Sequence, residues 1–164
     1  MLALLPLLLT PTASAGDILR IGVGHEWAIG MTPEDTSIGN SLSANAGYGF
    51  ALKIAKLIPE IGLSYAYQSN ILIPRAGARL QIGWILTPGV YAHANMPIGG
   101  PFATGTLGFD AGVSLHVAIP FVQIGAVGGI QVFGGESGPG IPDKNFVGML
   151  EIALALPVNR GGGD

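Results

Sequence analysis

Asp110, Ser114 and His116 are the residue types of a hydrolytic triad, and they lie close together in the chain. In such triads the histidine takes the proton of the serine hydroxyl and the aspartate orients the imidazole ring. All three positions have the same parity, so on a strand they would share one face. Same-face neighbours on a strand lie about 6.6 Å apart along its axis, which is beyond hydrogen-bond reach. We therefore interpret the three as polar residues of one strand face and expect no catalysis.

Other candidate sites have suitable residue types but unsuitable surroundings. His93 alternates with Tyr91 and Asn95 and has no second histidine or carboxylate at ligand spacing, so the run favours a lumenal or interfacial polar row over a metal site. His25 is the only histidine on an outward-facing apolar run, with no serine clearly beside it. The glycine-rich segments 125–135 and 161–163 lack the lysine and the strand-to-helix context of a phosphate loop. The chain has no cysteine. We expect neither a cofactor nor a metal.

A group of charged residues alternates with apolar positions along the predicted strands and forms the inward-facing set. We predict that these residues build a lumenal polar network: Arg20, Glu26, Lys53, Glu60, Arg79, Asp110, His116 and Glu151. With His116 neutral, three cations stand against four anions, and because an unpaired buried charge is costly, the set predicts cross-strand ion pairs. Lys53 and Glu60 flank a turn predicted at Pro59, and Arg20 and Glu151 are placed to meet where the first and last strands close. Such a network either blocks the lumen or lines a narrow solute path.

The composition limits which proteins can carry such a set. The 164 residues fit one domain, 49% of them are hydrophobic and 10% are charged, where a soluble domain has about 25% charged residues. No stretch supplies the ~20 consecutive apolar residues of a membrane-spanning helix. A net charge of −3 with seven Lys and Arg leaves no basic stripe for nucleic acid. The chain is expected to meet lipid through strands.

The N-terminal segment is predicted to be a targeting signal. Residues 1–15 read as a short apolar run followed by Ala13-Ser14-Ala15, the pattern of a secretory signal peptide with its cleavage site. No Lys or Arg precedes the apolar run, so either the start lies upstream or the signal is atypical. The predicted domains are a signal peptide at 1–15, a barrel at 16–157 and a flexible C-terminal tail at 158–164.

Beyond Gly16 the hydrophobic pattern has a period of two, which is typical of strands. Between Leu107 and Val117, for example, every odd position is apolar and every even position is small or polar. Gly128-Gly129 interrupts one run and predicts a bulge. We predict eight strands, at 17–31, 42–55, 59–69, 74–86, 88–97, 103–118, 120–133 and 145–156.

Two kinds of connection alternate along these runs. Tight turns are predicted at Pro59, Pro88 and Pro120, because proline cannot donate to a strand ladder. Longer segments are predicted at 32–41, 69–73, 98–102 and 134–144. Short turns at one end and long loops at the other are typical of an outer-membrane barrel.

Lipid favours a closed sheet, because no backbone group can stay unpaired in hydrocarbon. The fold class predicted is therefore an all-β, closed, eight-stranded antiparallel up-and-down transmembrane barrel. The small residues of the polar face suit a lumen that side chains fill. Several aromatic residues on the apolar faces are candidates for interfacial girdles: Trp27, Tyr48, Tyr65, Tyr67, Trp84, Phe109 and Phe146.

In pattern and strand count, residues 17–156 resemble the small OmpA-, OmpX- and OmpW-like outer-membrane barrels of Gram-negative bacteria. The last strand departs from them, because Leu154-Ala155-Leu156 continues into Pro157 where those families end in an aromatic assembly signal. The resemblance implies an outer-membrane location, contact with outer-membrane lipid and insertion by the outer-membrane assembly machinery.

Three functions remain open on the sequence. The first is a non-catalytic barrel with a structural or surface-recognition role carried by the loops at 32–41 and 134–144. The second is a narrow pore or a lateral transporter for small apolar molecules, which the likeness to OmpW implies. The third is a soluble lipocalin-like carrier. The sequence names no ligand.

Overall fold

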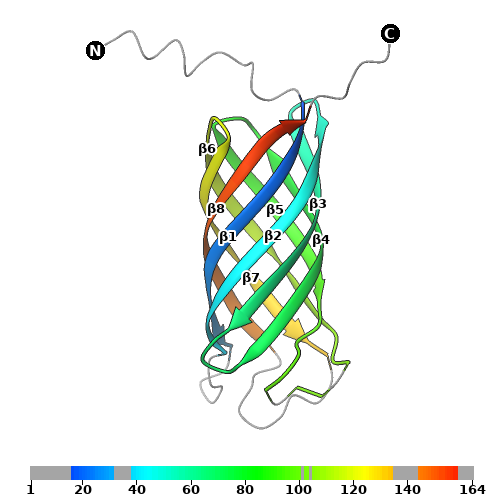
Figure 1. Ribbon diagram of the computed structural model, residues 1–164, viewed down its shortest axis with the longest axis vertical. Helices are drawn as coiled ribbons and strands as arrows, with labels where there is room; N and C mark the ends of the chain where they lie inside the picture. The colour runs from blue at the N-terminus through cyan, green and yellow to red at the C-terminus, as the bar shows by residue number, and fades with distance from the viewer. Residues whose placement is uncertain (1–15, 32–37, 101, 104, 135–143, 159–164) are drawn as a thin grey trace, which may run out of the picture.

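The computed structural model describes residues 16–31, 38–100, 102–103, 105–134 and 144–158. Within them the chain forms eight long, strongly tilted strands (Figure 1). The strands are β1 (Asp17–Gly30), β2 (Gly39–Leu52), β3 (Ala55–Ala66), β4 (Ile71–Ile82), β5 (Leu86–Asn95), β6 (Gly108–Ile119), β7 (Val122–Phe133) and β8 (Lys144–Val158). No helix in the described part of the chain is long and apolar enough to cross a membrane.

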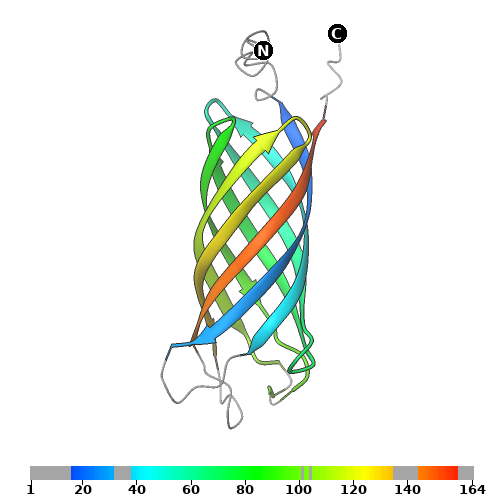
Figure 2. The ribbon, with the colours of Figure 1, turned by 90° about the vertical axis from the view of Figure 1, so that its left-hand side faces the viewer.

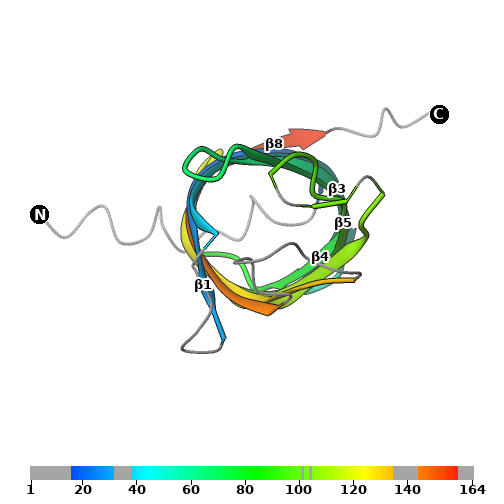
Figure 3. The same cartoon turned by 90° about the horizontal axis from the view of Figure 1, so that it is seen from below.

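Each strand pairs antiparallel with its neighbours in the sequence, and β1 pairs with β8 to close the barrel. Viewed along the axis, the strands form an unbroken ring (Figure 3). The predicted fold class is confirmed. The described chain begins and ends at the same end of the barrel as the turns β2–β3, β4–β5 and β6–β7 (Figure 2). We call this the turn end and the opposite one the loop end.

Side chains alternate between the outside and the lumen as the period of two predicts. On β6 the outward residues Val113 and Leu115 are 62% and 50% exposed, whereas Ser114 between them is 4% exposed. Charged and amide side chains face inward on most strands, and large apolar ones face outward on every strand. A soluble lipocalin-like barrel would need the reverse arrangement.

The turns correct several predicted boundaries. The β2–β3 turn lies at Lys53–Ile54 and the β4–β5 turn at residues 83–85, so Pro59 and Pro88 lie inside β3 and β5. Of the three predicted proline turns, only the one at Pro120 is present, between β6 and β7. At the loop end, β3 and β4 are joined by residues 67–70 alone, and the predicted loop 69–73 runs into β4. The predicted strands 42–55, 59–69 and 74–86 are therefore displaced by a few residues.

Prolines are tolerated inside these strands because their missing N–H groups fall where a ladder is interrupted or has ended. Opposite Pro59, the β2–β3 register has a gap between the pairs Gly47–Glu60 and Phe50–Leu57. The β4–β5 ladder ends at Gln81–Gly89, one residue before Pro88. Where the ladder stops beside a proline, no carbonyl group of the neighbouring strand depends on the N–H that proline lacks.

The bulge predicted at Gly128-Gly129 is wrong. Both residues pair one-to-one with β6 and with β8. Gly129 faces inward, where an added Cβ would collide with the Tyr91 hydroxyl and the Ala111 carbonyl. Gly128 faces outward, with the nearest neighbouring atom 4.0 Å from an added Cβ. The two glycines interrupt the hydrophobic pattern without disturbing the strand.

The loop end of the lumen holds an apolar cluster that the sequence pattern did not predict. The predicted strand at 103–118 begins only at Gly108, so residues 96–107 form a connection. Ile98 of this connection pairs with Leu72, and Phe102 packs on Phe133 with ring centroids 4.7 Å apart. The cluster consists of Ala28, Ile38, Ala66, Ile71, Ile73, Phe102, Phe133 and Val147.

Two predicted features lie wholly or mostly outside the described residues. These are the signal peptide at 1–15 and, except for Val158 in β8, the tail at 158–164.

Candidate functional site in the barrel lumen

Glu151 of β8 is the centre of the charged network in the lumen. Its Oε2 atom accepts hydrogen bonds from Arg20 Nη2 at 2.6 Å and Arg79 Nη1 at 3.0 Å. His116 Nε2 lies 2.8 Å from the same oxygen, and Asn45 Nδ2 donates to Oε1 at 2.6 Å. These partners come from four other strands, so one carboxylate ties β8 to β1, β2, β4 and β6.

Glu60 of β3 extends the network across the lumen. Its Oε1 atom lies 3.1 Å from Arg79 Nε and 2.8 Å from His93 Nε2. Its Oε2 atom faces Arg20 Nη1 at 3.6 Å. Arg79 therefore bridges the two glutamates, and because the side chains of both glutamates are at most 2% exposed, these are buried ion pairs.

A second pair lies nearer the loop end. Arg75 of β4 holds Glu26 of β1 through two hydrogen bonds of 2.7 Å, and Ser64 donates to the same carboxylate at 3.4 Å. This two-point geometry matches the planar guanidinium to the planar carboxylate and is stronger and more specific than a single contact. It fixes β1 against β4 across the inside of the barrel.

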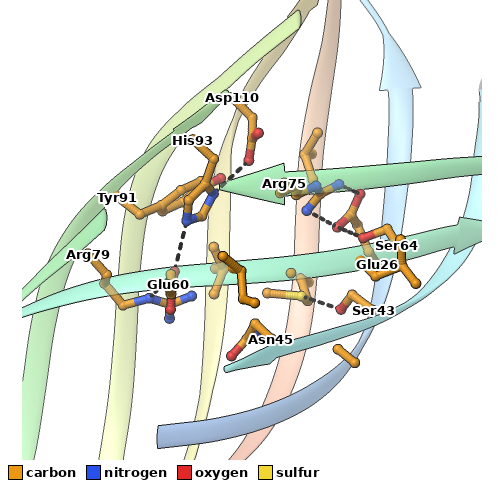
Figure 4. Close-up of a pocket in the computed structure, with 17 residues that line it drawn as sticks. Glu26, Ser43, Asn45, Glu60, Ser64, Arg75, Arg79, Tyr91, His93 and Asp110 are labelled. Carbon is orange, nitrogen blue, oxygen red and sulfur yellow. Dashed lines mark hydrogen bonds and ion pairs between the residues drawn. The ribbon is translucent and has the colours of Figure 1, made fainter. Parts of the chain in front are cut away.

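His93 connects Asp110 to Glu60 beside the cavity that the Arg75–Glu26 pair also lines (Figure 4). Its Nδ1 lies 3.1 Å from Asp110 Oδ2 and its Nε2 lies 2.8 Å from Glu60 Oε1. An imidazole donates from both nitrogens only as the imidazolium cation. His116 differs, because its Nδ1 faces the Gln81 amide nitrogen at 3.4 Å and its Nε2 faces Glu151, which a neutral ring satisfies.

With His93 charged, the network is electrically balanced. Its cations are Arg20, Arg75, Arg79 and His93, and its anions are Glu26, Glu60, Asp110 and Glu151. A buried charge without a partner costs several kcal/mol, so this balance is what allows eight charges to share the lumen.

Small residues provide the space that the network fills. A Cβ on Gly22 would lie 2.7 Å from Asn45 Oδ1 and 2.8 Å from Glu151 Oε1. The cavity that remains beside the network measures ≈ 30 Å³ and is lined by residues such as Glu60, Arg75 and His93 (Figure 4). That volume holds little more than a water molecule.

The structure places seven of the eight predicted site residues inside the barrel. They are Arg20, Glu26, Glu60, Arg79, Asp110, His116 and Glu151. The structure also pairs Arg20 with Glu151, as predicted for the place where the first and last strands meet. Lys53 is a correction: it lies exposed in the β2–β3 turn, well away from Glu60, because that turn precedes Pro59 by several residues.

Sequence reasoning missed several members of the network, namely Asn45, Arg75, Gln81, His93 as a charged link, and Gln123. Arg75 and Arg79 both occupy odd positions of one strand, so the alternation of side chains could have placed Arg75 in the lumen beside Arg79. The triad arrangement does not form, because Asp110 contacts His93 and Asn95 while His116 contacts Gln81 and Glu151.

A closed eight-stranded antiparallel barrel that is apolar outside and charged inside has the fold of a small outer-membrane β-barrel protein. Among solved structures, the crystal structure of Neisserial surface protein A (NspA) matches with a TM-score of 0.58. The match covers 87% of this chain and 97% of that chain at 13% sequence identity, so the likeness concerns the fold. No protein-family profile matches the chain, and neither does any curated protein sequence.

Proposed function

We propose that the protein is an integral barrel of a bacterial outer membrane, with a closed lumen and a structural or surface-recognition role without catalysis. Its apolar exterior supports membrane insertion. On this proposal outer-membrane lipid surrounds the strands, and the outer-membrane assembly machinery, which the family resemblance implies, inserts the chain. The turn end then faces the periplasm and the loop end faces the outside of the cell.

The observation that carries the closed lumen is the network itself. Glu151 and its partners Arg20, Arg79 and His116 are each at most 2% exposed and join opposite walls of the barrel. The buried apolar cluster around Phe102 and Phe133 lies at the loop end. Both layers stand against the narrow-pore alternative, since an ion would have to displace paired charges and then pass buried apolar side chains.

Single-channel recording in planar bilayers tests this function. The purified wild-type barrel is expected to show no discrete openings across a range of voltages. Heat-modifiable migration on a detergent gel, with boiled and unboiled samples compared, shows separately that the protein is folded. If the folded, inserted barrel gives reproducible conductance steps, the closed lumen is contradicted and the narrow-pore function is supported instead.

The recognition role is tested on the loops. Residues 32–37 and 135–143, the parts of the predicted loops 32–41 and 134–144 that lie outside the described residues, are replaced by short Asn-Gly turns, so that Ile38 and the strands are kept. The shortened barrel is expected to fold, because its network and cluster come mainly from strands, and to lose binding to cell-surface partners of the wild type. Unchanged binding after both replacements would contradict a recognition role for these loops.

A further inference from the structure

The outward belt of the barrel contains one residue that does not suit hydrocarbon. Away from the strand ends, His25 is the only Asp, Glu, Lys, Arg or His side chain that the described strands turn outward. A titratable side chain at membrane depth is costly and therefore marks a functional site by default. His25 needs polar partners that bulk acyl chains cannot supply.

The surroundings of His25 supply part of that need. Its Nε2 lies 3.3 Å from the hydroxyl of Tyr67, which follows β3 at the loop end. Trp27 lies beside it, with ring centroids 6.5 Å apart. Tyrosine and tryptophan are the residues of membrane interfaces. If the barrel is inserted as proposed above, these three residues are expected to lie near the headgroups of the leaflet at the loop end, where the polar groups of His25 and Tyr67 can reach a headgroup.

A shallow groove of ≈ 800 Å³ runs along the outer wall next to this polar pair. Cross-strand pairing defines its two edges. The row on the loop side is Leu150, His25, Leu42 and Tyr65, and the row on the turn side is Ile124, Ile152, Val23, Ala44 and Leu63. Because the strands tilt, the groove descends from the loop end of β3 toward the turn end of β7.

We propose that this groove binds one membrane lipid that carries a phosphate, with the phosphate at His25 and Tyr67 and an acyl chain along the groove. The polar pair lies on the loop side of the groove and keeps a hydrogen-bond donor for a headgroup, and the apolar rows continue from it toward the turn end of β7. This polarity matches a lipid of the loop-side leaflet. A second copy of the chain would bring another apolar belt against His25, which would supply no phosphate to the polar pair.

Ala44 provides a way to test the groove without altering the polar pair. Ala44→Phe fills the groove, and Ala92→Phe makes the same substitution at an exposed outward position on β5, away from it. His25→Leu with Tyr67→Phe removes the headgroup contacts. All variants are checked for folding by heat-modifiable migration.

Native mass spectrometry of the detergent-solubilised full chain measures the retained lipid directly. Phosphatidylglycerol and a diacylglycerol with the same acyl chains are the probes. The wild type and Ala92→Phe are expected to retain one phosphatidylglycerol and no diacylglycerol, and retention should fall about tenfold in His25→Leu/Tyr67→Phe and in Ala44→Phe.

Equal retention by all folded variants, equal retention of the two lipids, or a dimer that Ala44→Phe abolishes would overturn the proposal. The site rests on membrane insertion as proposed above, and the two can fail separately. A chain that does not float with vesicles contradicts insertion, whereas a chain that floats but retains no phosphatidylglycerol contradicts only the site.

Discussion

Arg20 and Glu151 join the first and last strands of the barrel through a hydrogen bond of 2.6 Å inside the lumen. Backbone pairing of β1 with β8 closes the sheet, and this ion pair crosses the same seam from within. Arg20 Nε and Nη1 also donate to Gln123 and Asn45, so all three guanidinium nitrogens are used. Arg20 therefore joins the two closing strands and has its buried charge satisfied at the same place.

Neutralising Glu151 should destabilise the barrel strongly. Glu151→Gln keeps the shape of the side chain but leaves Arg20 and Arg79 short of one negative charge in a buried site. We expect a loss of about 3–5 kcal/mol in the free energy of unfolding, measured by urea titration in lipid vesicles. Lys53→Gln, in the exposed turn, is the control and should change the free energy by less than about 0.5 kcal/mol. Similar effects of the two substitutions would contradict the network.

The Glu26–Arg75 pair is open to a double-mutant cycle. Glu26→Gln and Arg75→Gln each leave one buried charge unpaired, whereas the double variant removes both charges. The double variant should therefore lose less stability than the sum of the single losses, with a coupling energy of about 1–3 kcal/mol. Additive losses in the same urea titration would mean that the two side chains do not act on each other.

The two lumenal histidines should differ in charge. His93 contacts a carboxylate through each nitrogen, whereas His116 contacts one carboxylate and one amide. Nitrogen-15 NMR of the barrel in micelles near neutral pH is expected to show protons on both nitrogens of His93 and on Nε2 alone of His116. A spectrum in which both histidine rings are neutral would contradict the charge balance described for the lumen.

Neighbouring glycines on β7 should respond in opposite ways to alanine. Gly129→Ala places a methyl group against the Tyr91 hydroxyl and the Ala111 carbonyl, and we expect it to cost about 1–3 kcal/mol. Gly128→Ala points outward, where the nearest atom lies 4.0 Å from the added Cβ, and should be neutral or slightly stabilising. Equilibrium unfolding of the two variants compares them directly. A larger loss for Gly128→Ala would mean that β7 faces the other way.

The faces of the strands were predictable because successive side chains of a strand point to opposite sides, so the sequence alone assigns each residue to a face. Val113 and Ser114 needed no knowledge of partners to be assigned to opposite faces. Arg20 and Glu151 were predictable as partners because the first and last strands of a closed meander must meet.

The strand ends were less predictable, because proline marks the end of a ladder on one side of a strand and not the end of the strand. Pro59 shows this most clearly, since β3 continues through it while the β2–β3 register is interrupted beside it. That error placed Lys53 in the lumen. The apolar cluster at the loop end was not predictable at all, because Phe102 reaches the lumen from a connection where alternation no longer applies.

The most direct test of the account is which solvent the outward face of β6 meets. The chain has no cysteine, so spin labels can be attached to single cysteines at Val113, Leu115 and, as an aqueous reference, Lys53. In vesicles, electron paramagnetic resonance should find the labels at Val113 and Leu115 accessible to oxygen and shielded from a water-soluble nickel chelate, with the reverse at Lys53. Labels at Val113 and Leu115 that the chelate reaches as readily as Lys53 would contradict an outward face in hydrocarbon.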